Sequence, residues 1–218
     1  MNRIIHTLVF ILAAFAGTAQ QNSVATQILE RFRAKMEEHT ASEMNFTFTG
    51  ADAKGVSFSP LEGVIYRTGS DWTMLNPQVE VYVYGDTKWI YTTDNNEAII
   101  MQNDPASVDL TENPLALFSA QLSKEYRLSD KPKYFYDKGQ EITEITLTPA
   151  GKNMPYTSIL LRIKSQTLTP HSVKYNAKDG GWFEAVITDY IHKNQPFPPE
   201  RFIFSIKEHP GVFVTDLR

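Results

Sequence analysis

The chain has 218 residues, of which 42% are hydrophobic and none is cysteine. The formal net charge of −4 excludes the strongly basic balance that nucleic-acid-binding domains carry. Without cysteine the chain has neither disulfide bonds nor a lipid-modified N-terminal cysteine, so a hydrophobic core has to stabilise the fold.

The N-terminus has the pattern of a cleavable signal peptide. Arg3 precedes an apolar run over residues 4–15, which is shorter than the roughly 20 residues that a membrane-spanning helix needs. Small residues lead up to a cleavage position after Ala19. We therefore predict a signal peptide over residues 1–19 and a single domain over residues 20–218, exported from the cytoplasm. The alternative is an uncleaved N-terminal anchor.

An amphipathic helix is predicted at the start of the exported domain. Val24, Ile28, Phe32 and Met36 recur at every fourth position, and charged residues lie between them. We expect this helix to end before Thr40.

Strands are predicted from residue 43 onward, where the apolar positions begin to alternate. Phe46 and Phe48 are the first alternating pair. Further strands are predicted at residues 61–68, 71–75, 79–84, 88–92, 98–102, 133–136, 141–148, 156–165, 171–176, 182–190 and 201–206. Many of the turns between them are short and rich in Gly, Asn and Asp, which favours antiparallel neighbours.

A second helix interrupts the strands. Asn113-Pro114 is a favoured helix start, and Leu115, Phe118 and Leu122 follow at helical spacing. Roughly a dozen antiparallel strands in one domain are expected to curl, and the helices then cover the hollow side. The fold class predicted is α+β, mainly antiparallel β: a strongly bent, incomplete β-barrel with a lid of short helices over its concave apolar face.

Catalytic and metal-binding motifs are missing from the sequence. The histidines have no metal-ligand spacing, there is no cysteine to bind zinc, and no nucleophile elbow or phosphate-binding glycine loop occurs. We therefore expect neither an enzyme nor a metal or cofactor site. A periplasmic hydrolase would need an acid, base or nucleophile set that the sequence does not show.

Aromatic residues are concentrated in the predicted strands. They are typical of strands in general, and together they also suit the wall of a concave apolar cavity. The expected cavity and lid residues are Phe32, Met36, Phe46, Phe48, Tyr66, Trp72, Tyr82, Trp89, Tyr91, Leu115, Phe118 and Leu122. Which strand positions face inward is left open, because a shift of one residue exchanges the two faces of a strand.

Several segments, in order along the chain, resemble the LolA-type periplasmic lipoprotein carriers. They are Gly63-Val64-Ile65-Tyr66-Arg67 with Trp72, Gly85-Asp86-Thr87-Lys88-Trp89-Ile90-Tyr91, Asn96-Glu97-Ala98, Asn113-Pro114-Leu115, Phe202-Ile203-Phe204 and Pro210-Gly211-Val212-Phe213-Val214-Thr215-Asp216. The chain departs from the family in its reversed Gly85-Asp86 turn, in Arg67-Thr68-Gly69 where a basic residue and proline are usual, and in Trp72 where Phe is usual.

The resemblance implies a periplasmic carrier without catalytic activity. Such a carrier binds the acyl chains of lipoproteins in a hydrophobic cavity and transfers them from the inner to the outer membrane. Its implied partners are acylated lipoproteins, an inner-membrane lipoprotein-releasing transporter and an outer-membrane acceptor, but not nucleic acid, and we expect a monomer. Arg67 corresponds to the residue that ties the lid to the sheet in the family. The alternative function is a periplasmic lipid-binding sensor or regulator on the same half-barrel.

Overall fold

The computed structural model describes residues 23–104, 126–151 and 154–218. The predicted signal peptide and the lid residues Leu115, Phe118 and Leu122 lie outside these ranges. The described elements are α1 (Val24–Glu37), β1 (Ala41–Ala51), β2 (Leu61–Thr68), β3 (Asp71–Leu75), β4 (Val79–Tyr84), β5 (Thr87–Thr92), β6 (Glu97–Gln102), β7 (Tyr126–Leu128), β8 (Lys133–Asp137), β9 (Gln140–Pro149), β10 (Tyr156–Lys164), β11 (Thr169–Ala177), β12 (Trp182–Lys193), the 3₁₀ helices η1 (Pro199–Phe202) and η2 (Ile206–Glu208), and β13 (Phe213–Asp216).

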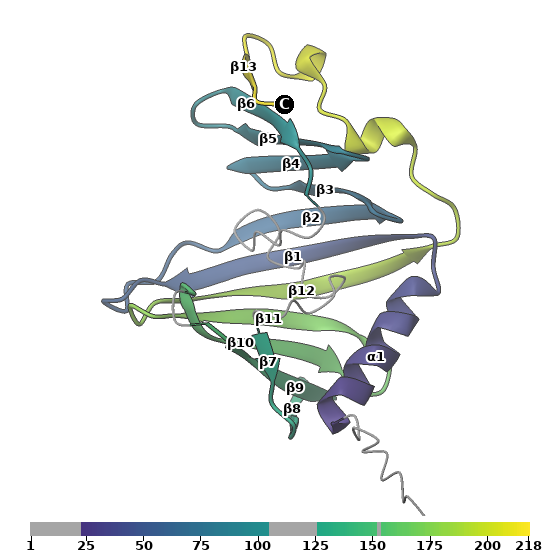
Figure 1. Ribbon diagram of the computed structural model, residues 1–218, viewed down its shortest axis with the longest axis vertical. Coiled ribbons are helices and arrows are strands. Elements are labelled where there is room, and N and C mark those ends of the chain that lie inside the picture. Colours follow the sequence, from purple (N-terminus) through teal and green to yellow (C-terminus); the bar gives the residue numbers. More distant parts are fainter. Residues whose placement is uncertain (1–22, 105–125, 152–153) are drawn as a thin grey trace, which may run out of the picture.

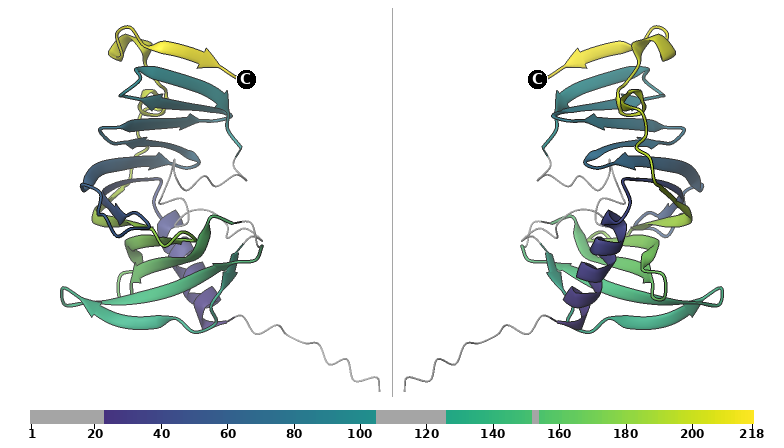
Figure 2. Two further views of the ribbon diagram at one scale, coloured as in Figure 1. Left: turned by 90° about the vertical axis from the view of Figure 1, so that its left-hand side faces the viewer. Right: turned by 90° about the vertical axis from the view of Figure 1, so that its right-hand side faces the viewer.

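The strands form one open sheet of thirteen strands, so the predicted incomplete barrel is confirmed (Figure 1). The order is β13-β6-β5-β4-β3-β2-β1-β12-β11-β10-β9-β7, and β8 pairs with β9. All pairs are antiparallel except β13 with β6, which is parallel. The register shifts in the β1–β12 and β10–β11 pairs, and such bulges bend strands. Figure 2 shows the resulting curvature of the sheet.

Helix α1 begins and ends close to the predicted positions. The Ser23 hydroxyl accepts a hydrogen bond from the Thr26 N–H at 3.2 Å, which caps the N-terminus. The buried face of the helix consists of Ala25, Leu29, Phe32 and Met36. These side chains belong to the main hydrophobic core. The helix itself lies by the β9–β12 half of the sheet (Figure 1).

The two faces of the sheet follow from the strand register, because directly paired residues point to the same side. One row runs across six strands through Met44, Ile65, Met74, Val81, Ile90 and Ile99. Four of these side chains are buried in the same core as α1. We call the face that carries this row and α1 the inner face, and the opposite face the outer face.

The strand predicted at residues 201–206 is wrong. Two 3₁₀ helices, η1 and η2, occupy this segment, with Ile203 extended between them. Two prolines at 198 and 199 favour the turn that begins η1. Phe202 and Phe204 are buried, so the apolar alternation reflects a segment that packs on the sheet without pairing in it. Two short strands, β7 and β13, were not among the predicted elements.

Candidate ligand-binding site

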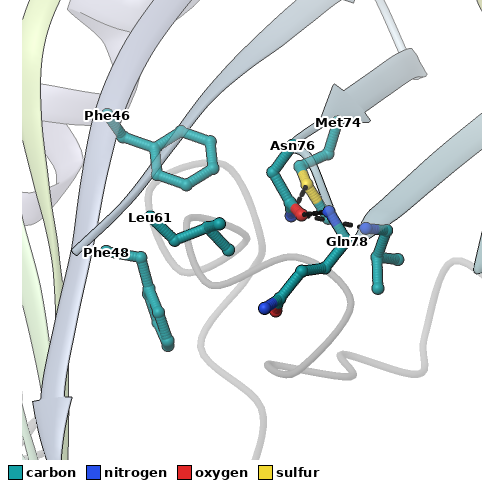
Figure 3. Close-up of a pocket in the computed structure, with 7 residues that line it drawn as sticks. Phe46, Phe48, Leu61, Met74, Asn76 and Gln78 are labelled. Atoms are coloured by element: carbon teal, nitrogen blue, oxygen red, sulfur yellow. Dashed lines mark hydrogen bonds between the residues drawn. The ribbon is translucent and has the colours of Figure 1, made fainter. Parts of the chain in front are cut away.

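A cavity of about 150 Å³ opens on the inner face between β1 and β4 (Figure 3). Its lining residues are Phe46, Phe48, Leu61, Met74, Asn76, Gln78 and Val79. Most of them are apolar, and the two polar ones carry uncharged amides. The lining is therefore chemically suited to an apolar ligand.

The polar rim of the cavity is held in place by Asn76. Its side-chain oxygen accepts hydrogen bonds from the backbone N–H groups of Gln78 and Val79, each at 2.9 Å. Its amide nitrogen donates to the Met74 sulfur at 3.2 Å. Asn76 thus fixes the β3–β4 turn against the cavity wall, and its own polar atoms are satisfied from within the turn (Figure 3).

Gly63 shapes the opposite wall. It is paired with Phe46 across the β1–β2 ladder, and the Phe46 ring lies over it. A Cβ atom at position 63 would collide with the Phe46 ring and come within 2.9 Å of the Leu75 carbonyl oxygen. Glycine is required here because only a missing side chain leaves room for the ring across the strand.

Arg67 connects the C-terminal end of α1 to the sheet. One guanidinium nitrogen donates to the Met36 carbonyl oxygen at 3.1 Å, and another donates to the Gly69 carbonyl oxygen at 3.2 Å. A cation at this end of a helix also interacts favourably with the helix dipole. Arg67, which the resemblance implies as a lid latch, thus contacts the backbone of α1, and the latch role stays a prediction.

The junction around Arg67 contains several poorly satisfied polar groups. Among the described residues, Arg67 Nε and His192 Nδ1 are buried here without a hydrogen-bond partner, and the buried hydroxyls of Ser42 and Tyr190 are neighbours of each other. Burial raises the pKa of Tyr190, against the lowering effect of the neighbouring Ser42 and Arg67. Unpaired buried polar groups cost free energy. The two unpartnered nitrogens therefore reduce the free energy gained by burying this end of α1.

Two histidines face each other in the same junction. The rings of His39, which follows α1, and His192 on β12 have centroids 3.9 Å apart. Burial lowers the pKa of His192, and the nearby His39 and Lys35 lower it further, while Glu38 acts in the opposite direction. The neutral imidazole is therefore the form that this contact favours.

The structure divides the predicted cavity residues between the two faces of the sheet. Phe46 and Phe48 line the cavity, and Trp72 packs against the same inner core. Phe32 and Met36 reach that core from α1. By contrast, a second row, paired across β2 to β5, contains Tyr66, Thr73, Tyr82 and Trp89. It lies on the outer face, and Tyr91 shares that face, being two residues from Trp89.

The outer-face aromatics are covered by the C-terminal segment. Tyr82 and Tyr91 pack against Phe204, with ring centroids 5.7 and 5.5 Å apart. The Arg201 guanidinium lies 4.4 Å from the centre of the Tyr66 ring. The expectation of one common aromatic wall is thus corrected: alternation along each strand sends Tyr66, Tyr82, Trp89 and Tyr91 to the side opposite the cavity.

Sequence reasoning missed the remaining cavity residues, which are Leu61, Met74, Asn76, Gln78 and Val79. Met74 could have been predicted, because it lies two residues from Trp72 and therefore on the same face of the strand. The amides of the β3–β4 turn carried no comparable signal, because turn residues are polar in most proteins.

Groups of three or more side chains able to hold a metal ion do not occur among the described residues. His171 lies 3.0 Å from Asp137, and His209 lies 3.1 Å from Glu80, so each imidazole has a carboxylate neighbour. Within residues 23–104, 126–151 and 154–218, no helix is long and apolar enough to cross a bilayer.

The fold and the site define a class of protein: an open, curved antiparallel sheet whose inner apolar face carries a helix and a cavity. No family model and no curated protein sequence matches the chain. A solved structure of an uncharacterised conserved protein from Thermus thermophilus is similar, with a TM-score of 0.57 and 12% identity over 88% of this chain and 98% of that one.

Two further similar structures have lower scores. One is a putative outer membrane lipoprotein-sorting protein domain from Vibrio parahaemolyticus, with a TM-score of 0.45 and 12% identity over 80% of this chain and 94% of that one. The other is a LolA superfamily protein from Nitrosomonas europaea, with a TM-score of 0.40 and 10% identity over 81% and 97%. At 12% identity, the likeness to the Thermus thermophilus structure describes the fold alone.

Proposed function

We propose that the protein is a periplasmic carrier that holds the acyl chains of lipoproteins against its inner face and transfers them from the inner to the outer membrane. The observation that carries this proposal is the cavity bounded by Phe46, Phe48 and Met74, which has no charged residue in its lining. The resemblance of the sequence to LolA-type carriers supports it. Nothing in this role requires a catalytic group.

The energetics of the cargo explain why such a face is needed. An acyl chain loses about 0.8 kcal/mol of favourable burial for each CH₂ group that leaves a bilayer. A carrier has to replace this burial with apolar contacts and still release the chain. The row of Met44, Ile65, Met74, Val81 and Ile90 carries apolar side chains across five strands. Met74 already lines the cavity, and the buried members would contact an acyl chain once the cavity widens.

The cavity has to widen when it receives an acyl chain. Its volume of about 150 Å³ is below the roughly 300–1,000 Å³ of typical ligand pockets. Helix α1 contributes no residue to the described lining but covers the neighbouring part of the same inner face. Its withdrawal would extend the apolar surface beside the cavity, and the link from Arg67 to the Met36 carbonyl is the polar contact that such a movement breaks. We expect Arg67→Ala to speed the exchange of a bound fatty-acid probe.

A binding measurement tests the site. The purified protein is titrated with a fluorescent fatty acid, and Phe48→Asp is expected to weaken binding about tenfold or more, because a carboxylate is poorly tolerated in an apolar cavity. Trp89→Asp is the matched control, since it places the same charge on the outer face of the sheet. Thermal melts identify variants that fail to fold. Equal loss in both folded variants, or no loss in either, would refute the cavity assignment.

A cellular experiment tests the role. Depletion of the protein is expected to leave lipoproteins in the inner membrane, measured by membrane fractionation. Normal sorting after depletion, together with intact fatty-acid binding, would instead favour a lipid-binding sensor. Mass analysis of material that copurifies from the periplasm then distinguishes a triacylated lipoprotein from a free lipid.

A further inference from the structure

The hairpin of β8 and β9 lies at one end of the sheet (Figure 1). It exposes three consecutive aromatic side chains. Tyr134, Phe135 and Tyr136 are 55%, 37% and 73% exposed. Solvent-exposed aromatics adjacent in a regular strand are unusual on a monomeric surface and mark interaction sites. Within the described ranges, β9 is the only strand paired with β8, so β8 forms an edge of the sheet.

The backbone of β8 has a defined set of outward-facing groups. The hairpin turns through Lys138 and Gly139, both with positive φ, and Asp137 is paired with Gln140. A two-residue turn of this kind is closed by a hydrogen-bonded pair. Alternation along the ladder then directs the N–H and C=O groups of Phe135 toward β9 and those of Tyr134 and Tyr136 toward the free edge.

The sequence of this edge is complementary to itself. When two copies of β8 are placed antiparallel about a twofold axis at Phe135, Lys133 faces Asp137 of the other copy and Tyr134 faces Tyr136. In this register the outward groups of Tyr134 and Tyr136 form the hydrogen-bonded pairs, and the two Phe135 side chains meet at a non-hydrogen-bonded pair. Opposite charges and aromatic pairs across strands both stabilise a sheet. A twofold axis is also the commonest symmetry of homo-oligomers.

The charged side chains are available for this arrangement. The Lys133 side chain is 75% exposed, and its Nζ lies 3.7 Å from Glu144. The Asp137 side chain is 43% exposed, and one of its oxygens lies 3.0 Å from His171. Each can meet a second partner from the solvent side. Registers centred on Tyr134 or Tyr136 would lose the charge match, and the first would also oppose Tyr136 to Pro132, which has no N–H group to donate.

We propose that the protein forms a twofold homodimer through antiparallel pairing of its β8 edges, with Lys133 and Asp137 as the reciprocal ion pairs. The partner that fits this surface is a second copy of the chain. An interface formed by one short strand on each side is small, so the dimer is weak and depends on protein concentration. The monomer expected from the sequence is then the form at low concentration. This proposal does not depend on the carrier role.

Sedimentation velocity over a concentration series tests the dimer. The unmodified protein is expected to shift from monomer to dimer as concentration rises. Tyr136→Pro removes an N–H group that points away from β9, so it leaves the hairpin paired and weakens dimerisation about tenfold or more. Tyr136→Ala is the matched control, because it keeps the N–H group and is expected to weaken the dimer less.

Charge reversal tests the register. Lys133→Asp and Asp137→Lys each place like charges opposite one another and are expected to weaken the dimer by about threefold to tenfold. The double variant restores opposite charges and is expected to return the dissociation constant to within about twofold of the original. Failure of the double variant to recover, while both single variants remain folded, would overturn the proposed register.

Amide hydrogen exchange gives a residue-level readout. The Phe135 amide is expected to be protected at every concentration, whereas the Tyr134 and Tyr136 amides gain protection only as the dimer forms. A monomer at the highest soluble concentration, or a dimer that Tyr136→Pro does not weaken, would overturn the proposal. Binding to phosphatidylcholine–phosphatidylglycerol vesicles without self-association would also overturn it and would assign the tyrosines to a lipid surface.

Discussion

Two segments cover the sheet from opposite sides, and they are attached by different kinds of contact. Helix α1 docks on the inner face through buried apolar side chains, and Arg67 supplies a polar link at its C-terminal end. The C-terminal segment crosses the outer face through a series of directional hydrogen bonds. Thr73 donates to the Arg201 carbonyl oxygen at 2.7 Å, and the Phe197 N–H donates to the Thr68 hydroxyl at 3.1 Å.

His209 adds a further attachment for the C-terminal segment. Its two ring nitrogens lie 2.9 Å from the Ser205 carbonyl oxygen and 3.1 Å from Glu80 Oε2. The Tyr82 hydroxyl donates to the same carboxylate oxygen at 2.6 Å, and burial together with this carboxylate raises the pKa of Tyr82. Hydrogen bonds lose strength steeply with misalignment, so these contacts define the position of the C-terminal segment on the outer face. Helix α1 is held mainly by the burial of its apolar side chains.

The largest effect is expected from removing the main apolar anchor of the helix. Phe32 is fully buried, and Phe32→Ala is expected to lower the free energy of unfolding by about 3–5 kcal/mol. Urea denaturation measures the change. Val24→Ala, at a position 54% exposed on the same helix, is the control and should change stability by less than about 0.5 kcal/mol. Equal effects of the two substitutions would show that α1 is not docked as described.

Removal of the corresponding apolar anchor on the outer face should lower the free energy of unfolding by a smaller amount. Phe204 belongs to a smaller cluster with Tyr91 and Ala98. Phe204→Ala is expected to destabilise by about 2–4 kcal/mol, because the hydrogen bonds of the segment remain. Fatty-acid binding should be unchanged, since the cavity lies on the other face. A loss of binding at unchanged fold would contradict the separation of the two faces.

A third substitution fills the inner wall. Gly63→Val is expected to push the Phe46 ring off β2 and to destabilise the fold by about 1–3 kcal/mol. It should also change the affinity for a fatty-acid probe, because Phe46 lines the cavity. Gly151→Ala serves as a control, since a Cβ atom there meets nothing within 4 Å. Thermal melting and probe titration measure both consequences.

The smallest effect concerns pH at the C-terminal end of α1. The pKa of His192 is lowered in the folded state, so the unfolded chain binds its proton more readily. The contribution of His192 to stability is then complete above the unfolded pKa of about 6.5 and is lost as the pH falls below it. His192→Gln should flatten the decline in melting temperature between about pH 7 and pH 5.5. A steeper decline in the variant would contradict this sign.

The alternation of apolar residues predicts a strand well where short turns join it to its neighbouring strands in the sheet. The strands Leu61–Thr68, Asp71–Leu75 and Val79–Tyr84 have the predicted bounds, because each short turn and each two-residue period is a local property. The same reasoning fails for residues 201–206. Phe202 and Phe204 alternate as a strand would, yet they are buried by packing onto a sheet that other strands form.

Local patterns in the chain are thus sufficient for the amphipathic helix, for most strands and for the expectation of a curved open sheet. They do not distinguish the inner from the outer face, because a strand alternates equally well in either parity. Long-range register decides that question: pairing of Met44 with Ile65 places Phe46 and Phe48 beside the cavity, whereas Trp89 lies under the C-terminal segment. The tertiary structure also decides that β8 pairs only with β9 among the described strands and so lies at an edge of the sheet.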